Sequence, residues 1–181
     1  MYRQIKWSDR LKNKGGKMQK GDIEYFFTRY YSMVFRVAYM EVKSKADADD
    51  ITQEVFIRVL GKAPEFASEE HEKAWIIRVT INLCRDLLKS KWNRDTVGID
   101  NINIYECEDF AGIGNYDNEV LSNLCLLDEK YRRPLYLFYY EDYSVREISE
   151  LLAVPENTVK TNLRRGRKKL GEMISKEREN I

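Results

Sequence analysis

The chain has 181 residues, which is enough for one domain of ordinary size or for two small ones. Its 31 lysines and arginines almost balance its 30 acidic residues, and the net charge of +1 argues against a uniformly basic nucleic-acid binder. Three cysteines without a CxxC pair and a single histidine support neither a disulfide framework nor a zinc site, so no cofactor is expected. No apolar run approaches the roughly 18 residues of a membrane-spanning helix, and we expect a cytoplasmic protein without membrane insertion.

Charge is distributed unevenly along the chain. Residues 1–20 carry seven basic side chains and one acid, and residues 158–178 carry eight basic side chains and two acids. Residues 93–118 carry six acids and one basic residue, Arg94. Only three prolines and nine glycines interrupt the sequence, and its apolar periodicity is helical, which predicts an all-α fold. We expect two small helical domains joined by a flexible acidic linker: an arm at 1–21, domains at 22–92 and 118–174, the linker at 93–117 and a tail at 175–181.

The first predicted domain has three helices, at about residues 22–40, 47–60 and 72–92. Dense aromatic and aliphatic residues make the first helix largely buried. The second is expected to end at Gly61. The third has an apolar stripe that we expect to be its buried side: Ile76, Val79, Leu83 and Leu87.

The second predicted domain ends in a helix-turn-helix. Ser144 and Glu147 have the spacing of a capping box, which begins a short helix over 145–152. Pro155 favours a new helix start, and a long basic helix follows to about residue 174. Opposite its apolar stripe this helix has a polar, basic face suited to reading base edges and pairing with phosphates: Asn157, Lys160, Thr161, Arg164, Arg165 and Lys168. A solvated helix that happens to be basic is the plain alternative.

Basic and aromatic residues also share one side of the third helix, namely Arg78, Asn82, Arg85, Lys89 and Trp92. With Phe66 and Trp75 nearby, this pattern suits single-stranded DNA, whose bases stack on aromatic rings while basic groups follow the phosphates. Surface charges beside core tryptophans are an equally simple interpretation.

The second helix has a core stripe of Ala48, Ile51, Val55 and Val59, yet Phe56, Ile57 and Leu60 are apolar off that stripe. A helix that is apolar on two sides often has a second partner. Packing of Phe56 within its own domain is the common alternative, and the neighbouring acids without histidine make a metal site a weak hypothesis.

Three segments in order resemble a known family. They are Asp47-Ala-Asp-Asp-Ile-Thr-Gln-Glu-Val-Phe-Ile, Trp75-Ile-Ile-Arg-Val-Thr-Ile-Asn-Leu-Cys-Arg-Asp, and Tyr143-Ser-Val-Arg-Glu-Ile-Ser-Glu-Leu-Leu followed by Thr158-Val-Lys-Thr. The chain resembles a bacterial RNA polymerase sigma factor of the extracytoplasmic-function group of the sigma-70 family. The resemblance covers about residues 22–92 and 118–174.

The resemblance implies a dissociable promoter-specificity subunit of RNA polymerase without catalytic residues. Residues 22–92 would read and melt the minus-ten element, with residues 62–68 and Asn82 capturing unstacked bases, and residues 118–174 would bind the minus-thirty-five element. The acidic linker would thread toward the polymerase active-site cleft. The implied partners are core RNA polymerase, promoter DNA in double- and single-stranded form, and an anti-sigma factor. The polymerase-docking residues would be Asp49, Asp50, Gln53, Glu54 and Ile57.

Two other functions remain open from the sequence alone. A free-standing helix-turn-helix regulator would use residues 22–92 as a sensor or dimerisation domain and would bind paired half-sites as a dimer. A metal-dependent nuclease would need a convergent set of ligands or a nucleophile with a base, and the sequence shows no such set.

Overall fold

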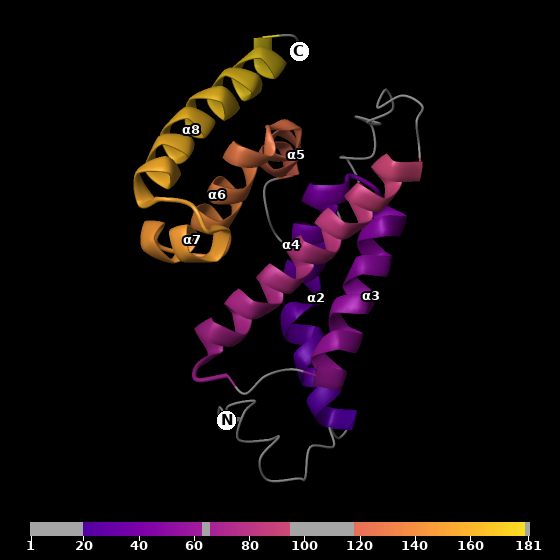
Figure 1. Cartoon of the computed structure of the whole chain (residues 1–181). Helices are drawn as coiled ribbons and strands as arrows, with labels where there is room; N and C mark the ends of the chain where they lie inside the picture. The colour runs from indigo at the N-terminus through magenta and orange to yellow at the C-terminus, as the bar shows by residue number, and fades with distance from the viewer. Residues whose placement is uncertain (1–19, 63–65, 95–117, 180–181) are drawn as a thin grey trace. The chain divides into compact units, whose positions relative to one another are not determined.

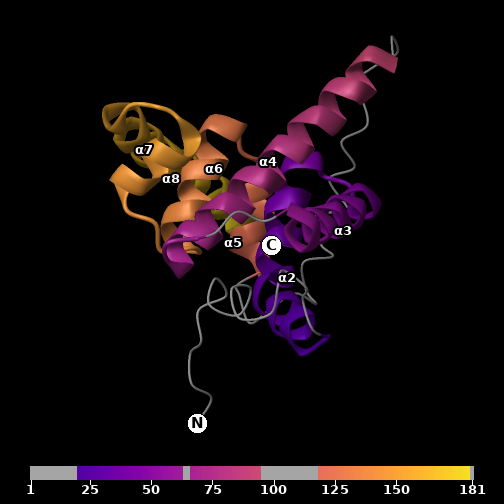
Figure 2. The same cartoon turned by 60° about the horizontal axis from the view of Figure 1, so that its bottom comes forward.

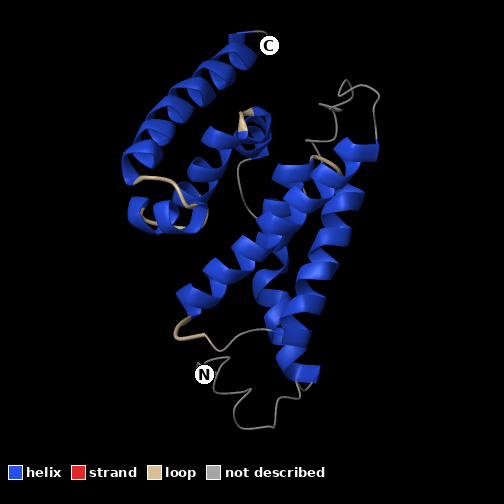
Figure 3. Cartoon of the chain, viewed as in Figure 1, coloured by secondary structure: helices blue, strands red, loops and turns tan. Residues whose placement is uncertain are grey.

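The computed structural model describes residues 20–62, 66–94 and 118–179, which form helices and no strand (Figures 1 and 3). The chain divides into two compact units, the first with three of these helices and the second with four, which confirms the predicted all-α architecture of two helical domains. The predicted arm up to residue 19 and almost all of the acidic linker lie outside the described residues. The helices are α2 (Lys20–Val42), α3 (Lys45–Lys62), α4 (Glu69–Arg94), α5 (Asn118–Leu126), α6 (Glu129–Tyr139), α7 (Val145–Leu152) and α8 (Glu156–Glu179).

The first unit is a bundle of α2, α3 and α4, each of which packs against the other two (Figure 2). Between α2 and α3 the chain reverses at Lys43, whose φ of 55° is left-handed. Ser44 then caps α3, because its hydroxyl accepts from the backbone N–H of Asp47 at 3.4 Å. Fully buried apolar side chains from all three helices form the core, among them Phe26, Val34, Ala38, Ala48, Val55, Ile76 and Ile77.

All three helices of this unit are longer than the sequence predicted, α2 by about two residues at each end. α3 continues through Gly61 to Lys62, because a single glycine lowers helix propensity without breaking a helix. α4 begins at Glu69 instead of residue 72, since Ser68 caps it: the Ser68 hydroxyl accepts from the N–H of His71 at 3.2 Å and its carbonyl from that of Glu72 at 3.1 Å.

The predicted buried stripe of α4 is wrong except at Ile76. Val79, Leu83 and Leu87 are only half-buried. α4 packs against both α2 and α3. The arc of α4 that these two helices cover is therefore wider than one stripe, and its centre lies on the side of Ile76 away from Val79 and Leu83. The side chains that it buries are Glu72, Ile76, Ile77, Thr80, Ile81 and Cys84.

The second unit contains the helix-turn-helix. Ser144 and Glu147 form the predicted capping box at the start of α7, with each side chain bound to the backbone N–H of the other. α7 ends at Ala153, whose left-handed φ of 55° turns the chain toward α8. The Ser149 hydroxyl donates to the Val154 carbonyl at 2.6 Å and fixes this turn. Ile148 and Leu151 from α7 and Val159 and Leu163 from α8 form the buried contact between the two helices.

α8 extends beyond the predicted end at about residue 174, to Glu179. Its last turns are held against α5: the Asn123 amide donates to the Glu177 carboxylate at 2.7 Å, and Arg178 pairs with Glu119 at 3.4 Å. Farther back, Gly166 brings α8 close to α6, because a Cβ there would lie 2.8 Å from the Leu135 Cδ1 atom. α8 is therefore held by its own unit both near its middle and at its C-terminal end.

Within the described ranges, no helix combines the length and the apolar character that spanning a membrane requires.

Candidate nucleic-acid interface

The predicted reading face of α8 is exposed. Asn157, Lys160, Arg164, Arg165 and Lys168 are all exposed, and Thr161 is half-buried among them. Weak ion pairs with acids of the same helix are made by Lys160 with Glu156 at 3.7 Å and by Lys168 with Glu172 at 3.8 Å. The opposite side of the helix is buried at Val159, Leu163 and Gly166, so one arc faces the core and the other is free for a ligand.

Buried polar contacts behind this face hold the helix-turn-helix in place. The Tyr136 hydroxyl donates to the buried Glu141 carboxylate at 2.6 Å, across the segment that joins α6 to α7. The backbone N–H of Tyr143 donates to the Leu137 carbonyl at 3.0 Å. The buried Arg132 donates to the Leu127 carbonyl at 2.8 Å and so caps the end of α5. The first two bonds fix the start of α7 relative to α6, and the third fixes the end of α5.

The sequence interpretation missed an aromatic group beside the reading face. Tyr139 at the end of α6 is exposed, and its hydroxyl accepts from Arg167 of α8 at 3.3 Å. The exposed Phe138 packs edge to face on Tyr139, with 5.1 Å between ring centroids. The aromatic run at residues 138–140 was the available signal, but its helical phase does not separate core from surface.

The predicted single-strand face of α4 is also exposed along its whole length. Arg78, Asn82, Arg85, Lys89 and Trp92 are exposed, and Trp92 has 65% of its surface free. At the start of the helix, the buried Phe66 packs against the half-buried Trp75 with 5.5 Å between ring centroids. Residues 63–65 of the expected base-capturing segment lie outside the described residues.

The two apolar sides of α3 have different environments. Phe56 is only 7% exposed and packs on Phe26, Phe27 and Tyr31 of α2, so its partner is its own domain. Ile57 is 61% exposed and Leu60 is 39% exposed, and both remain uncovered within the unit.

Ile57 and Leu60 share their side of α3 with two of the predicted docking residues, Asp50 and Gln53, which are exposed. The other two predicted docking residues are half-buried and already have partners. Asp49 accepts from the Tyr31 hydroxyl at 3.5 Å, and Glu54 pairs with Arg58 at 2.8 Å.

A buried acid at the start of α4 was not anticipated. Glu72 is only 4% exposed, and burial raises the pKa of its carboxyl to about 7, although the charge of Arg29 opposes this rise. Arg29 binds the neighbouring Glu69 through two hydrogen bonds, at 2.5 and 3.2 Å. In the sequence, the burial of Glu72 was indicated only by its position four residues before Ile76, on the same side of the helix.

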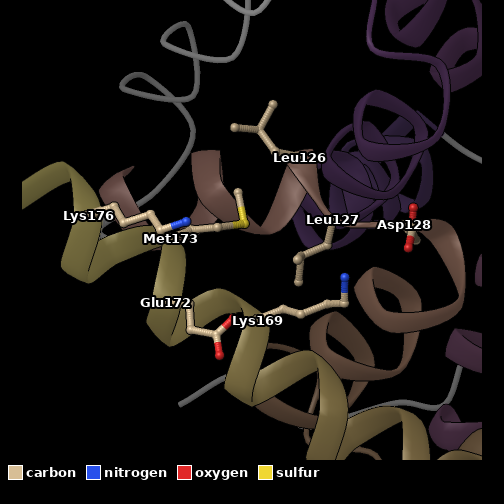
Figure 4. Close-up of a pocket in the computed structure, with 7 residues that line it drawn as sticks. All are labelled: Leu126, Leu127, Asp128, Lys169, Glu172, Met173 and Lys176. Atoms are coloured by element: carbon tan, nitrogen blue, oxygen red, sulfur yellow. The ribbon is translucent and has the colours of Figure 1, made fainter.

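A pocket of about 230 Å³ lies in the second unit, between α8 and the turn from α5 to α6. Figure 4 shows Lys169 and Met173 extending from α8 toward that turn. Its lining includes no serine, cysteine or histidine. It combines apolar side chains with two lysines and two acids, and consists of Leu126, Leu127, Asp128, Lys169, Glu172, Met173 and Lys176. Among the described residues, no cluster of three metal-ligating side chains is present.

Two family models match the chain, and they match one unit each. Residues 26–94 match sigma-70 region 2, and residues 118–170 match sigma-70 region 4. The first match spans α4 with its exposed basic and aromatic face, and the second spans the helix-turn-helix. Together they cover more than half of the chain, which therefore belongs to the sigma-70 family of RNA polymerase sigma factors.

Curated relatives narrow this to the extracytoplasmic-function group. The chain is 26% identical over 180 residues to "ECF RNA polymerase sigma factor SigW" of Bacillus subtilis (strain 168), covering 91% of this chain and 96% of that protein. It is 28% identical over 147 residues to "RNA polymerase sigma factor SigV" of the same organism, covering 79% of this chain and 85% of the relative. The chain is thus a sigma factor of this group, as its sequence resemblance predicted.

Solved structures show the same fold. The sigma factor RpoE of Bartonella quintana, crystallised with the anti-sigma factor NepR, aligns with a TM-score of 0.66 at 16% identity over 85% of this chain and 97% of that one. CnrH, in complex with the cytosolic domain of CnrY, aligns with a TM-score of 0.61 at 18% identity over 93% of this chain and 94% of that one.

A sigma factor is the promoter-specificity subunit of bacterial RNA polymerase, and this is the function of the chain. Its partners are core polymerase and promoter DNA, and it directs initiation by recognising the minus-ten and minus-thirty-five elements and helping to melt the DNA. The alternative of a regulator outside the polymerase is not favoured, because residues 26–94 match the sigma-70 region 2 model instead of a separate sensor domain.

Proposed function

We propose that the two exposed faces divide the reading of the promoter between them. The α8 face (Asn157, Lys160, Thr161, Arg164, Arg165 and Lys168) reads the duplex minus-thirty-five element. The α4 face (Arg78, Asn82, Arg85, Lys89 and Trp92) holds the unpaired minus-ten strand. A duplex hides its base faces, so only the second task needs aromatic side chains for stacking, and Trp92 is the most exposed large apolar side chain among the described residues.

The observation that carries this division is the exposure of both faces on helices whose opposite sides are buried. Asn and Arg side chains can bond base edges bidentately in the major groove, and Asn157 and Arg164 lie two turns apart on the same side of α8. Lysines and the remaining arginines at the borders of the face pair with phosphates and fix the register.

Core polymerase binds the exposed side of α3. Ile57 and Leu60 supply apolar area there, with Asp50 and Gln53 beside them. The structure favours these over Asp49 and Glu54, whose side chains already have partners within the unit. An interface of this kind gains its affinity from a few uncovered apolar anchors, with polar groups at the rim setting specificity.

The chain also fits a protein that is held inactive by an anti-sigma factor. One structure with the same fold is a complex of the sigma factor RpoE with the anti-sigma factor NepR, and another is CnrH with the cytosolic domain of CnrY. The uncovered Ile57 and Leu60 are a surface that an inhibitor and core polymerase would compete for. The chain acts in the cytoplasm, where its polymerase and DNA are, and catalyses no reaction of its own.

Transcription from genomic DNA with core polymerase tests the function directly. Purified chain added to core enzyme is expected to start transcripts at a defined set of positions that core enzyme alone does not use. Arg164→Ala is expected to reduce these starts, whereas Lys176→Ala, which removes a positive charge far along the same helix, leaves them unchanged. If the chain binds promoter DNA as a dimer without core enzyme and adds no starts, it is a separate regulator.

A further inference from the structure

The buried Glu72 lies in the first turn of α4, a few residues after the expected base-capturing segment at residues 62–68. It begins a line of buried side chains at helical spacing, followed by Ile76, Thr80 and Cys84. Its own backbone N–H is bonded to the Ser68 carbonyl at 3.1 Å, so it belongs to the first turn of the helix. Trp75, which packs on Phe66, follows one turn later.

The groups around Glu72 do not balance the negative charge of its ionised carboxylate. Burial raises the pKa of the Glu72 carboxyl, and from α2 the Arg29 guanidinium and the Tyr30 hydroxyl oppose this rise. Arg29, however, is bound at 2.5 and 3.2 Å to Glu69, and it also donates to the Tyr25 hydroxyl at 2.7 Å. Two carboxylates thus share one guanidinium, and the buried one of the two makes no hydrogen bond to it that would balance its charge.

Protonation removes this imbalance. A neutral Glu72 has no uncompensated charge and fits its buried place, whereas an ionised Glu72 is stabilised by moving toward water. Because the residue is in the first turn, such a movement would loosen the contact of α4 with α2. It would also disturb the seat of the Phe66–Trp75 pair, which lies on either side of Glu72 in the chain.

We propose that Glu72 is a positioning residue whose protonation seats the first turn of α4, and with it the Phe66–Trp75 pair, for the capture of unpaired promoter bases. The inference rests on the proposed function of the α4 face. It adds that promoter opening by this sigma factor weakens as the pH rises through neutrality. Binding of core polymerase through α3 is not affected by the same proton.

The fluorescence of Trp75 tests the seating in the free protein. The chain has three tryptophans, so the full chain carrying Trp7→Phe and Trp92→Phe reports on Trp75 alone. We expect a fluorescence transition with a midpoint near pH 7, which Glu72→Gln removes. His71 is exposed in the same turn, and its effect on Trp75 fluorescence has to be distinguished from that of Glu72. His71→Gln is therefore the matched control and is expected to keep the transition.

A second variant makes the prediction sharper. Glu69→Gln frees Arg29 from its ion pair and removes the neighbouring negative charge, and both changes favour the ionised form of Glu72. The midpoint is therefore expected to move to lower pH. If Glu72→Gln keeps the transition of the reference protein, or Glu69→Gln leaves its midpoint in place, the inference is wrong.

Promoter opening by the holoenzyme supplies the functional test. Permanganate reactivity of thymines near the start site is compared at equal promoter occupancy at about pH 6 and about pH 8, on either side of the Glu72 transition. The permanganate reactivity obtained with Glu72→Gln, divided by that of wild type, is expected to be at least about threefold higher at the higher pH. The reason is that the glutamine side chain stays neutral at both pH values. An equal ratio at both pH values overturns the inference. Absence of opening by both proteins at any pH instead overturns the proposed function of the α4 face, and with it the role of Glu72 in opening.

Discussion

The two long helices that carry the proposed DNA-binding faces are held by their units in different ways. α8 buries one arc, at Val159, Leu163 and Gly166, and leaves the remainder half-buried or exposed. α4 packs against both α2 and α3, so its buried arc is broad and includes an acid and a threonine, Glu72 and Thr80. The face of α8 is consequently set by its own sequence, whereas the face of α4 depends on how two other helices cover it.

This difference has a consequence for what each unit can do besides binding DNA. α8 has a plain amphipathic pattern and serves as a rigid reader. The unit of α4 contains Glu72, whose pKa burial raises to about 7, and an uncovered apolar side on α3, so it can respond to a proton and to a protein partner.

The largest expected effect concerns the uncovered side of α3. Asp50→Arg combined with Gln53→Ala is expected to weaken holoenzyme formation by about 3 kcal/mol or more, roughly a hundredfold, because a like or unpaired charge is placed at the interface. Thermal stability should stay nearly unchanged, since both side chains are exposed. Competition with a labelled sigma factor for core enzyme measures this. The control Asp86→Arg reverses an exposed acid on α4 and should compete normally; normal competition by the double variant would remove the assignment of this surface.

The buried acid of α4 is expected to make stability depend on pH. The native protein keeps the Glu72 proton up to about pH 7, whereas the ordinary value of 4.5 describes the unfolded chain. The wild type therefore loses stability as the pH rises from about 4.5 to about 7. Glu72→Gln should be more stable than wild type at about pH 8, by up to about 3 kcal/mol, and equal to it at about pH 4. Urea unfolding at both pH values checks this, and a constant difference would contradict it.

The reading face of α8 is expected to act through direct contacts. Arg164→Ala should cost about 1–3 kcal/mol in binding of the minus-thirty-five element and relax specificity at one base pair, if it reads a base edge. Because Arg164 is exposed, the fold should be unaffected. Binding to a set of single-base promoter variants measures both effects. Identical binding of all variants by mutant and wild type would show that the face is misassigned.

The smallest expected effects are changes in stability caused by two glycine-to-alanine substitutions in α8, one limited by packing and the other by helix propensity. Gly166→Ala should destabilise the protein by about 1–2 kcal/mol, because the new Cβ meets Leu135 and Tyr131 of the buried side, which outweighs the gain in helix propensity. Gly171→Ala on the same helix meets nothing within 4 Å and should stabilise by about 0.5–1 kcal/mol. Thermal unfolding of the two variants should shift in opposite directions; equal shifts would mean that α6 and α8 are not in close contact at Gly166.

Much of the fold could be predicted from the sequence because its signals are local. The capping box of Ser144 and Glu147, the helix start after Pro155 and the core stripe of α3 each depend on residues within a few turns. The single basic face of α8 followed from periodicity for the same reason. Its exposure agrees with the prediction, while the contacts of its residues with DNA remain to be tested.

The buried side of α4 could not be predicted in the same way. Periodicity indicates that a helix is amphipathic, but two packing partners shifted the buried arc away from Val79, Leu83 and Leu87. Glu72 was missed because an acid is normally exposed, and its burial depends on Tyr30 and Arg29 from a helix about 40 residues earlier. The fate of Phe56 was open for a related reason, since it pairs with aromatic rings of α2 that the sequence alone does not place beside it.

We propose that core polymerase opens promoter DNA through the α4 face of this chain. Permanganate reactivity of thymines near the start site measures it most directly, with wild type, Asn82→Ala and Trp92→Ala compared at equal promoter occupancy. Wild type is expected to give reactive thymines, and both variants to occupy the promoter while opening fails, because the α8 and polymerase contacts remain and the stacking and base-edge contacts are lost. Normal opening by both variants would remove the assignment of these two residues. A promoter that wild-type holoenzyme occupies without any reactive thymine would show that the chain does not open promoter DNA.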